Sequence, residues 1–183
     1  MKKGKMTLKL TAALAMLSAI SIIAGKYLAI PGGEVLRFSF ENLPIILAGA
    51  AFGPLAGALV GAVADLVGCA LVGYAVNPAV TVGAVAIGAI SGSVWRICEK
   101  ITLPLWLRCA LAAALAHLVG SVLIKTFGLS AYYDMHFGIL LLWRLLNYVI
   151  VGSIEGVILY ALMKNKMITE EISSISGRKG GAR

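Results

Sequence analysis

The feature that most constrains this chain is a succession of long apolar stretches that contain few charged residues. Charged residues make up 13% of the sequence and hydrophobic residues 60%, whereas soluble domains carry about 25% charged residues. So few charged side chains cannot form the polar shell that a soluble fold of 183 residues needs. The sequence therefore predicts an integral membrane protein whose surface mostly contacts lipid.

The apolar stretches predict a set of transmembrane helices, because a helix needs about 20 apolar residues to cross the hydrocarbon core. The stretch 42–72 is too long for one such helix, and we divide it at Gly53–Pro54 since proline disfavours helical geometry in the residue before it. The expected helices cover residues 7–29, 42–52, 54–72, 79–97, 103–127 and 137–163. The predicted fold class is an all-α membrane protein, a compact bundle of six transmembrane helices.

The basic residues indicate the orientation of this bundle, since cytoplasmic loops of membrane proteins are enriched in Lys and Arg. Most of the 16 basic residues lie near the two chain ends or between the fourth and fifth helices, which places both termini in the cytoplasm. This topology accounts for the net charge of +8, so the charge does not indicate nucleic-acid binding. The first apolar stretch is longer than the core of a signal peptide, and we expect it to be retained.

The chain is expected to form one membrane domain with a short tail. Residues 1–166 would make up the six-helix transmembrane domain. Residues 167–183 are polar and glycine-rich, and we expect a frayed helix end followed by disorder in the cytoplasm.

The sequence contains no recognisable catalytic or metal-binding motif. HExxH, GxSxG and Walker sequences are absent, and the three cysteines show no CxxC pairing, so free thiols are expected. His117 and His136 lack neighbours at metal-ligand spacing, and Glu155 is expected to make an internal bond. We therefore predict no enzyme, no cofactor and no metal site. No filter sequence of a channel is present either.

A loop after the first helix carries the first candidate binding residues. Arg37 stands beside Phe38 and Phe40 at the predicted outer face. A guanidinium group matches a carboxylate through two parallel hydrogen bonds, and the aromatic rings offer surfaces on which a flat ligand can stack. An interfacial arginine within an aromatic belt is the alternative interpretation.

Further polar residues lie inside the predicted helices, where they are costly unless paired or hydrated. Asp65 lies near Gly68 in the third helix, Asn77 and Thr81 lie at the start of the fourth, and Arg144 lies in the sixth. Asn77 is also in position to cap its helix. Together with the aromatic loop, these residues predict an outer pocket for one flat, anionic small molecule.

The first helix carries a face of small residues. Thr11, Ala15 and Ala19 recur every four residues. Small residues allow helices in lipid to approach closely, so this face either packs inside the bundle or faces outward to contact a partner helix.

Three motifs in fixed order give the chain a family resemblance. These are LRFSFENLP at 36–44, AGAAFGPLAG at 48–57 and GAVADLVG at 61–68. The chain thereby resembles the substrate-binding S components of energy-coupling factor (ECF) vitamin transporters, most closely the folate-specific branch. Each motif alone is weak, and the order of all three carries the resemblance.

The resemblance implies a membrane subunit that binds folate or a reduced folate from outside the cell. Uptake would be driven by a separate module with a transmembrane coupling subunit and two ATP-hydrolysing subunits, in the plasma membrane of a prokaryote. Ala15 and Ala19 resemble the family's contact face for the coupling subunit. Alternatives are an S component for another vitamin or heterocycle, or a membrane-embedded enzyme or sensor.

The resemblance also implies roles for the candidate residues. Arg37 would meet a glutamate carboxylate or the pterin edge, and Phe38 and Phe40 would stack on the ring system. The remaining substrate-binding candidates are Asp65, Gly68, Asn77, Thr81 and Arg144.

Overall fold

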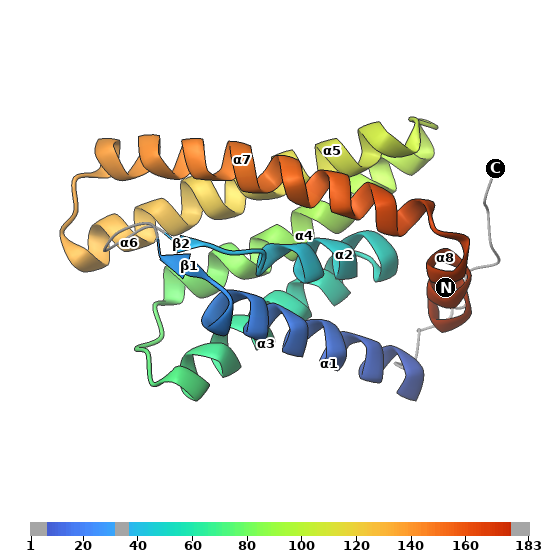
Figure 1. Cartoon of the computed structure of the whole chain (residues 1–183), viewed down its shortest axis with the longest axis horizontal. Coiled ribbons are helices and arrows are strands. Elements are labelled where there is room, and N and C mark those ends of the chain that lie inside the picture. Colours follow the sequence, from blue (N-terminus) through green and yellow to red (C-terminus); the bar gives the residue numbers. More distant parts are fainter. Residues whose placement is uncertain (1–6, 32–36, 177–183) are drawn as a thin grey trace.

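A computed structural model describes residues 7–31 and 37–176, which are mainly helical (Figure 1). The helices are α1 (Leu8–Ile22), η1 (Ile23–Tyr27), α2 (Asn42–Phe52), α3 (Pro54–Val72), α4 (Pro78–Lys100), α5 (Leu105–Ala116), η2 (His117–Ile124), α6 (Lys125–Tyr133), α7 (Phe137–Lys164) and α8 (Lys166–Ser176). The segments η1 and η2 are π-helical turns that continue α1 and α5. A small hairpin joins β1 (Ile30–Pro31) to β2 (Arg37–Phe38) in antiparallel register.

Five helical segments within the described ranges are long and apolar enough to cross a membrane. They are Leu8–Tyr27, Pro54–Val72, Pro78–Lys100, Leu105–Tyr132 and Phe137–Lys164. Helix α2 has 11 residues, so at about 1.5 Å per residue it covers roughly half of the hydrocarbon core. Apart from the two-stranded hairpin, the predicted helical membrane architecture is thus confirmed with five such segments, and α2 and α3 occupy the ranges that the sequence predicts.

The break between α2 and α3 has a local cause. Gly53 has φ +104°, a conformation that side chains disfavour, and its amide donates to the Gly49 carbonyl at 2.8 Å. Pro54 then begins α3, where its missing N–H costs no helical hydrogen bond. The chain therefore reverses within one residue, and α2 packs back against α3.

Helices α2, α3 and α4 touch through their backbones. A Cβ atom added to Gly88 on α4 would collide with the backbone carbonyl of Gly57 on α3, and one added to Gly49 on α2 would lie 2.6 Å from the Gly88 carbonyl oxygen. A Cβ on Gly61 would meet the Ala84 carbonyl. Because lipid provides no hydrophobic drive for association, such close contacts hold membrane helices together.

The distribution of side-chain size reverses that of a soluble domain. Large apolar residues such as Leu55, Ile139 and Val157 face outward, as expected of a surface in contact with lipid. The core contains many small residues, with larger ones such as Ile46 and Ile87 between them.

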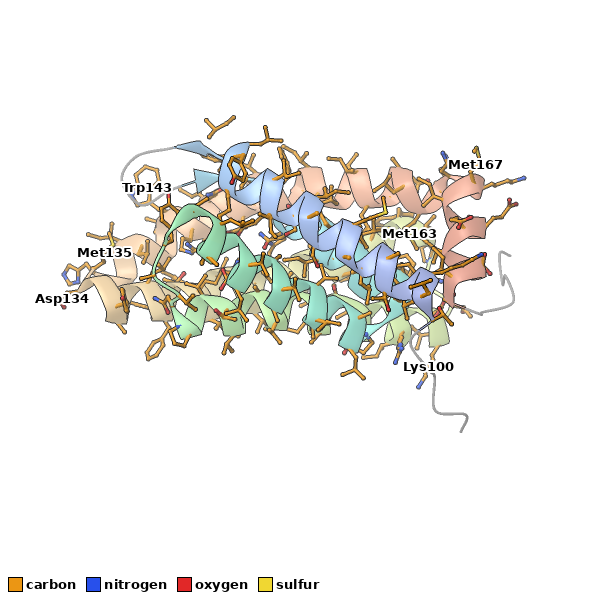
Figure 2. The ribbon with its side chains drawn as sticks, turned by 90° about the horizontal axis from the view of Figure 1, so that it is seen from below. Lys100, Asp134, Met135, Trp143, Met163 and Met167 are labelled. Atoms are coloured by element: carbon orange, nitrogen blue, oxygen red, sulfur yellow. The ribbon has the colours of Figure 1, made fainter. Side chains whose placement is uncertain are left out.

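The two ends of the bundle differ. Figure 2 shows Asp134, Met135 and Trp143 at one end, with Lys100 and Met167 at the other. Helix α8 lies across the second end against α1, α2 and α7 (Figure 1), where α1 also begins. The frayed helix end expected after residue 166 is instead a regular helix as far as Ser176, and residues 177–183 lie outside the described ranges.

Candidate functional site

A cavity of about 670 Å³ opens at the end of the bundle opposite α8. Its lining comes from η1, the segment before α2, α3, the α3–α4 connection, α6 and α7. Pockets of about 300–1,000 Å³ accommodate small molecules and cofactors. The cavity is thus large enough for a vitamin-sized ligand.

The charged side chains described in the cavity lining are mostly cationic. Three bases and two carboxylates line it: Lys26, Lys125, Arg144, Glu41 and Asp65. Tyr74 and Tyr148 add aromatic surface. In a low-dielectric site, this excess of positive charge favours an anionic ligand.

Glu41 and Lys125 form an ion pair in the cavity wall. Lys125 Nζ donates to Glu41 Oε1 at 3.2 Å, and the Lys125 side chain is 5% exposed. Glu41 lies just before α2; its burial alone would raise its pKa, but Lys125 and then Lys26 outweigh burial and lower it. The main chain of Glu41 is held as well, because Ser21 Oγ donates to its carbonyl at 2.6 Å.

Asp65 lies at the centre of a second polar group. Thr81 Oγ1 donates to Asp65 Oδ2 at 2.6 Å. The Cys69 thiol, one turn along α3, lies 4.0 Å from Asp65 Oδ1, and Lys26 Nζ lies 3.7 Å from Cys69 Sγ. This group leaves the Asp65 carboxylate at the cavity surface with a fixed orientation.

Gly68 provides space rather than a polar contact. A Cβ atom at this position would lie 2.9 Å from Lys26 Cε. The stem of Lys26 therefore crosses α3 at Gly68, and its ammonium group reaches the cavity, 5.7 Å from the centre of the Tyr74 ring.

Asn77 has a structural role and also lines the cavity. Its Oδ1 accepts from the Ala79 amide at 3.0 Å, so it caps α4, and its Nδ2 donates to the Gly128 carbonyl on α6 at 3.4 Å. Capping is one of the two roles that the sequence suggested for this residue.

Arg144 is held on the opposite wall. Its Nε and Nη2 donate to the Ser121 carbonyl of η2 at 3.2 and 3.0 Å, and its guanidinium carbon lies 5.4 Å from the centre of the Tyr148 ring. Asn147, on the next turn of α7, lines the cavity beside it.

The candidate residues of the hairpin, Arg37, Phe38 and Phe40, are not among the described residues that line the cavity. The backbone of Arg37 pairs with Pro31, and the Arg37 side chain lies outside the part of the chain that the structure describes. Phe38 and Phe40 are partly exposed, and Ser39 between them contributes to the lining. The structure thus gathers Asp65, Asn77 and Arg144 around the cavity, with Thr81 bonded to Asp65 and Gly68 behind Lys26.

Three charged lining residues are not among the binding residues predicted from the sequence: Lys26, Glu41 and Lys125. Lys26 and Lys125 lie near the predicted outer ends of the first and fifth helices. A signal was present, because both interrupt apolar runs, and an ionisable residue within a span is a functional candidate by default. Lys26 lies within η1 and Lys125 directly follows η2; π-helical turns often occur at functional sites.

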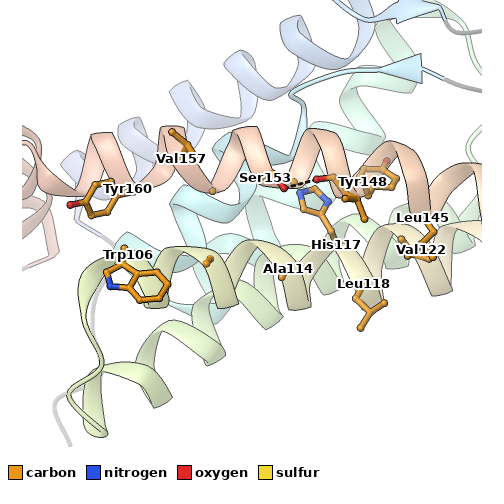
Figure 3. A pocket seen from close by; sticks show the side chains of 14 residues that line it. Trp106, Ala114, His117, Leu118, Val122, Leu145, Tyr148, Ser153, Val157 and Tyr160 are labelled. Atoms are coloured by element: carbon orange, nitrogen blue, oxygen red, sulfur yellow. Dashed lines mark hydrogen bonds between the residues drawn. The ribbon is translucent and has the colours of Figure 1, made fainter.

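A second hollow, the outer groove, lies between α5–η2 and α7. It measures about 620 Å³ and is lined mainly by apolar and aromatic residues. Figure 3 shows Trp106 and Tyr160 at one end of the groove and His117 beside Tyr148 further along. Several lining residues, such as Val149 and Val157, are exposed on the lipid-facing side.

Comparison with known proteins identifies a family, and the solved structures of similar fold include one bound with folic acid and an S component for biotin. The family described as "ECF transporter, substrate-specific component" matches residues 9–166. A crystal structure of FolT bound with folic acid superposes with a TM-score of 0.68 at 26% identity, covering 84% of this chain and 90% of that chain. The S component for biotin from an ECF-type ABC transporter gives 0.64 at 20% identity, covering 86% and 92%. No curated protein sequence matches the chain.

Proposed function

Because the chain belongs to the family of substrate-specific components of ECF transporters, we propose that it binds folate or a reduced folate in the cavity at the hairpin end. Family membership makes the chain the vitamin-binding membrane subunit of a transporter rather than an enzyme. The choice of folate rests on the chemistry of the lining, together with the likeness to FolT.

The observation that carries this proposal is that the cavity lining holds both a carboxylate acceptor and an excess of cations. Folate joins a flat pterin ring, which presents N–H donors, to a glutamate with two carboxylates. Asp65 is the acceptor suited to the pterin amino groups, and the cations Lys26 and Arg144 suit the carboxylates. Tyr74 offers an aromatic surface on which the ring can stack.

We propose that the loop residues predicted from the sequence also contact the ligand. Arg37 supplies a further cation, and Phe38 and Phe40 cover the ring system from the hairpin. Gly68, Asn77 and Thr81 act through their neighbours, since they make room for Lys26, connect α4 to α6 and orient Asp65 respectively.

We further propose that the cavity faces the outside and both termini face the cytoplasm. Counting α2 with the five longer segments gives six passes, an even number, and α1 begins at the end of the bundle where α7 ends. Among the described residues, the helix ends on that side carry Lys9, Lys100, Arg108, Lys164 and Lys166, which is the cytoplasmic pattern. In keeping with its family, we propose that the protein resides in the plasma membrane of a prokaryote.

The proposed partners are a transmembrane coupling subunit and two ATPase subunits. Ala15 and Ala19 are exposed on α1, so they are available to a partner helix. Small residues at such a face permit close approach in lipid.

A ligand panel tests the proposal directly. Purified protein, without nucleotide, is titrated with folic acid, 5-formyltetrahydrofolate, biotin, riboflavin and thiamin, and thermal shift and calorimetry are recorded. We expect both folates to raise the unfolding midpoint and the other vitamins to leave it unchanged. Binding of biotin, riboflavin or thiamin with no response to folates would overturn the folate assignment.

A matched pair of variants tests the location of the site. Lys26→Met removes a cavity cation, and Lys100→Met removes an exposed cation at the other end of the bundle. We expect Lys26→Met to weaken folate binding by about tenfold or more, the cost of a lost charged hydrogen bond, and Lys100→Met to have no effect. Equal affinities would place the ligand elsewhere.

A further inference from the structure

Tyr148 separates the two hollows of the molecule. It lines the cavity on one side and the outer groove on the other. Its ring stacks on the His117 imidazole, with a centroid distance of 5.0 Å and an interplanar angle of 26°. His117 lines only the groove, and Glu155 lines neither hollow within the described part of the chain. The wall of the cavity is therefore supported from behind by groups that do not reach the cavity.

These groups form a closed ring of contacts. His117 Nδ1 lies 3.3 Å from Ser121 Oγ, the Ser121 carbonyl accepts both hydrogen bonds from Arg144, and Arg144 lies over the Tyr148 ring that stacks on His117. Each member touches two others. A shift of the His117 ring would therefore move both Tyr148 and the carbonyl that holds Arg144.

The orientation of the His117 ring is fixed by Glu155. His117 Nε2 lies 2.6 Å from Glu155 Oε2, between residues 38 apart in sequence, and Glu155 is fully buried. Burying two polar side chains costs free energy that their mutual hydrogen bond only partly offsets. Stability alone thus gives a weak reason for such a pair at membrane depth, whereas fixing one geometry of the ring gives a clear one.

We propose that His117 and Glu155 are positioning residues of the binding cavity, which set the places of Tyr148 and Arg144 without touching the ligand. This inference rests on the proposed function, because it concerns the same cavity. Part of the affinity for a flat, anionic ligand would then depend on His117 and Glu155, neither of which lines the cavity. We also expect the pair to act through Arg144.

The first experiment needs no ligand. The rate at which phenylglyoxal modifies Arg144 is measured by mass spectrometry in the unliganded protein, with the exposed Arg96 as internal reference. We expect Glu155→Leu to raise this rate about fivefold or more, as for a lost contact of ordinary strength. Glu155→Gln keeps a hydrogen-bonding oxygen and should stay near the native rate, as should Ser153→Ala, which alters an exposed hydroxyl on α7. An unchanged rate in Glu155→Leu overturns the proposal.

A second variant keeps the proposal testable if Glu155→Leu fails to fold. His117→Phe retains a ring beside Tyr148 but removes the contacts to Glu155 and Ser121. It should also free Arg144 for modification. The same unfolding midpoint as the native protein would separate this effect from general loosening.

The closing experiment is a double-mutant cycle on folic acid affinity. We expect Glu155→Leu to weaken binding about fivefold in the native background and by clearly less in an Arg144→Met background, where only its effect through Tyr148 remains, because coupled residues are non-additive. Additive losses would show that Glu155 acts by another route and overturn the inference. Absence of folic acid binding by the native protein would overturn the proposed function instead, while Arg144 modification would still decide the positioning role.

Discussion

Lys125 Nζ and Glu41 Oε1 lie 3.2 Å apart although 84 residues separate them in the sequence. The pair joins the start of α6 to the residue that precedes α2, and both residues line the cavity. This contact therefore connects the segment between β2 and α2 to helix α6 across the cavity. We expect the ion pair to affect both the free energy of unfolding and the affinity of the cavity for its ligand.

Lys125→Met should destabilise the protein and weaken folate binding. The substitution leaves Glu41 without its nearest cation, and breaking a fully buried pair costs about 3–5 kcal/mol. Because Glu41 is 28% exposed, we expect a smaller loss of about 1–3 kcal/mol in the free energy of unfolding. The measurement is the unfolding midpoint in detergent, with Lys100→Met as control. Adding Glu41→Gln should recover part of the loss, and a midpoint unchanged in Lys125→Met would show that the pair contributes little.

Gly88→Ala should destabilise the bundle strongly. The new methyl group would overlap the Gly57 backbone, which cannot rotate away as a side chain would, and overpacking typically costs about 1–3 kcal/mol or more. Gly138→Ala on α7 is the matched control, because nothing lies within 4 Å of a Cβ there. Thermal unfolding of both variants is compared. Equal midpoints would mean that α3 and α4 can separate without cost.

Ala15→Trp and Ala19→Trp should separate binding from transport. Both alanines are exposed on α1 and contribute nothing to the cavity lining, so folate affinity of the isolated subunit should be unchanged. Uptake by cells that express the complete transporter should fall to background, because a bulky side chain blocks close helix approach. Leu142→Trp, at an exposed site on α7, is the control. Loss of binding in the alanine variants would indicate that this face packs within the bundle.

Cys69 should report occupancy of the cavity. It is the cysteine that lines the cavity, and Cys98 and Cys109 are buried elsewhere. In a Cys98→Ala/Cys109→Ala background, folic acid should slow alkylation of Cys69 by a small maleimide, measured by mass shift. Biotin should give no protection. Equal alkylation with and without folic acid, under conditions where calorimetry shows binding, would place the ligand away from α3.

The sequence predicts the helices well because their limits have local causes. Gly53 and Pro54 end one helix and begin the next through backbone properties alone, so the ranges 42–52 and 54–72 are correct. Helix α8 was not predicted because its segment is short and polar; the structure places it against α7, α2 and α1, with none of its residues buried. That packing is not visible in the segment itself.

The candidate site is only partly readable from sequence. Asp65, Asn77 and Arg144 stand out as polar residues in apolar surroundings, and each lines the cavity. The pairing of Lys125 with Glu41 depends on how segments 84 residues apart meet, which spacing along one helix does not reveal. Sequence spacing likewise does not predict the π-helical turn η2, so the register that brings the Ser121 carbonyl to Arg144 could not be predicted.

The backbone contact between Gly57 and Gly88 has a consequence for how ligand preference can change. Where main chains touch, no side chain is available to be exchanged, so α2, α3 and α4 form a frame that tolerates little redesign. Helices α6 and α7 supply the facing half of the cavity from replaceable side chains. New specificities within this architecture should therefore arise by substitutions on the facing half, with the glycine frame inherited intact.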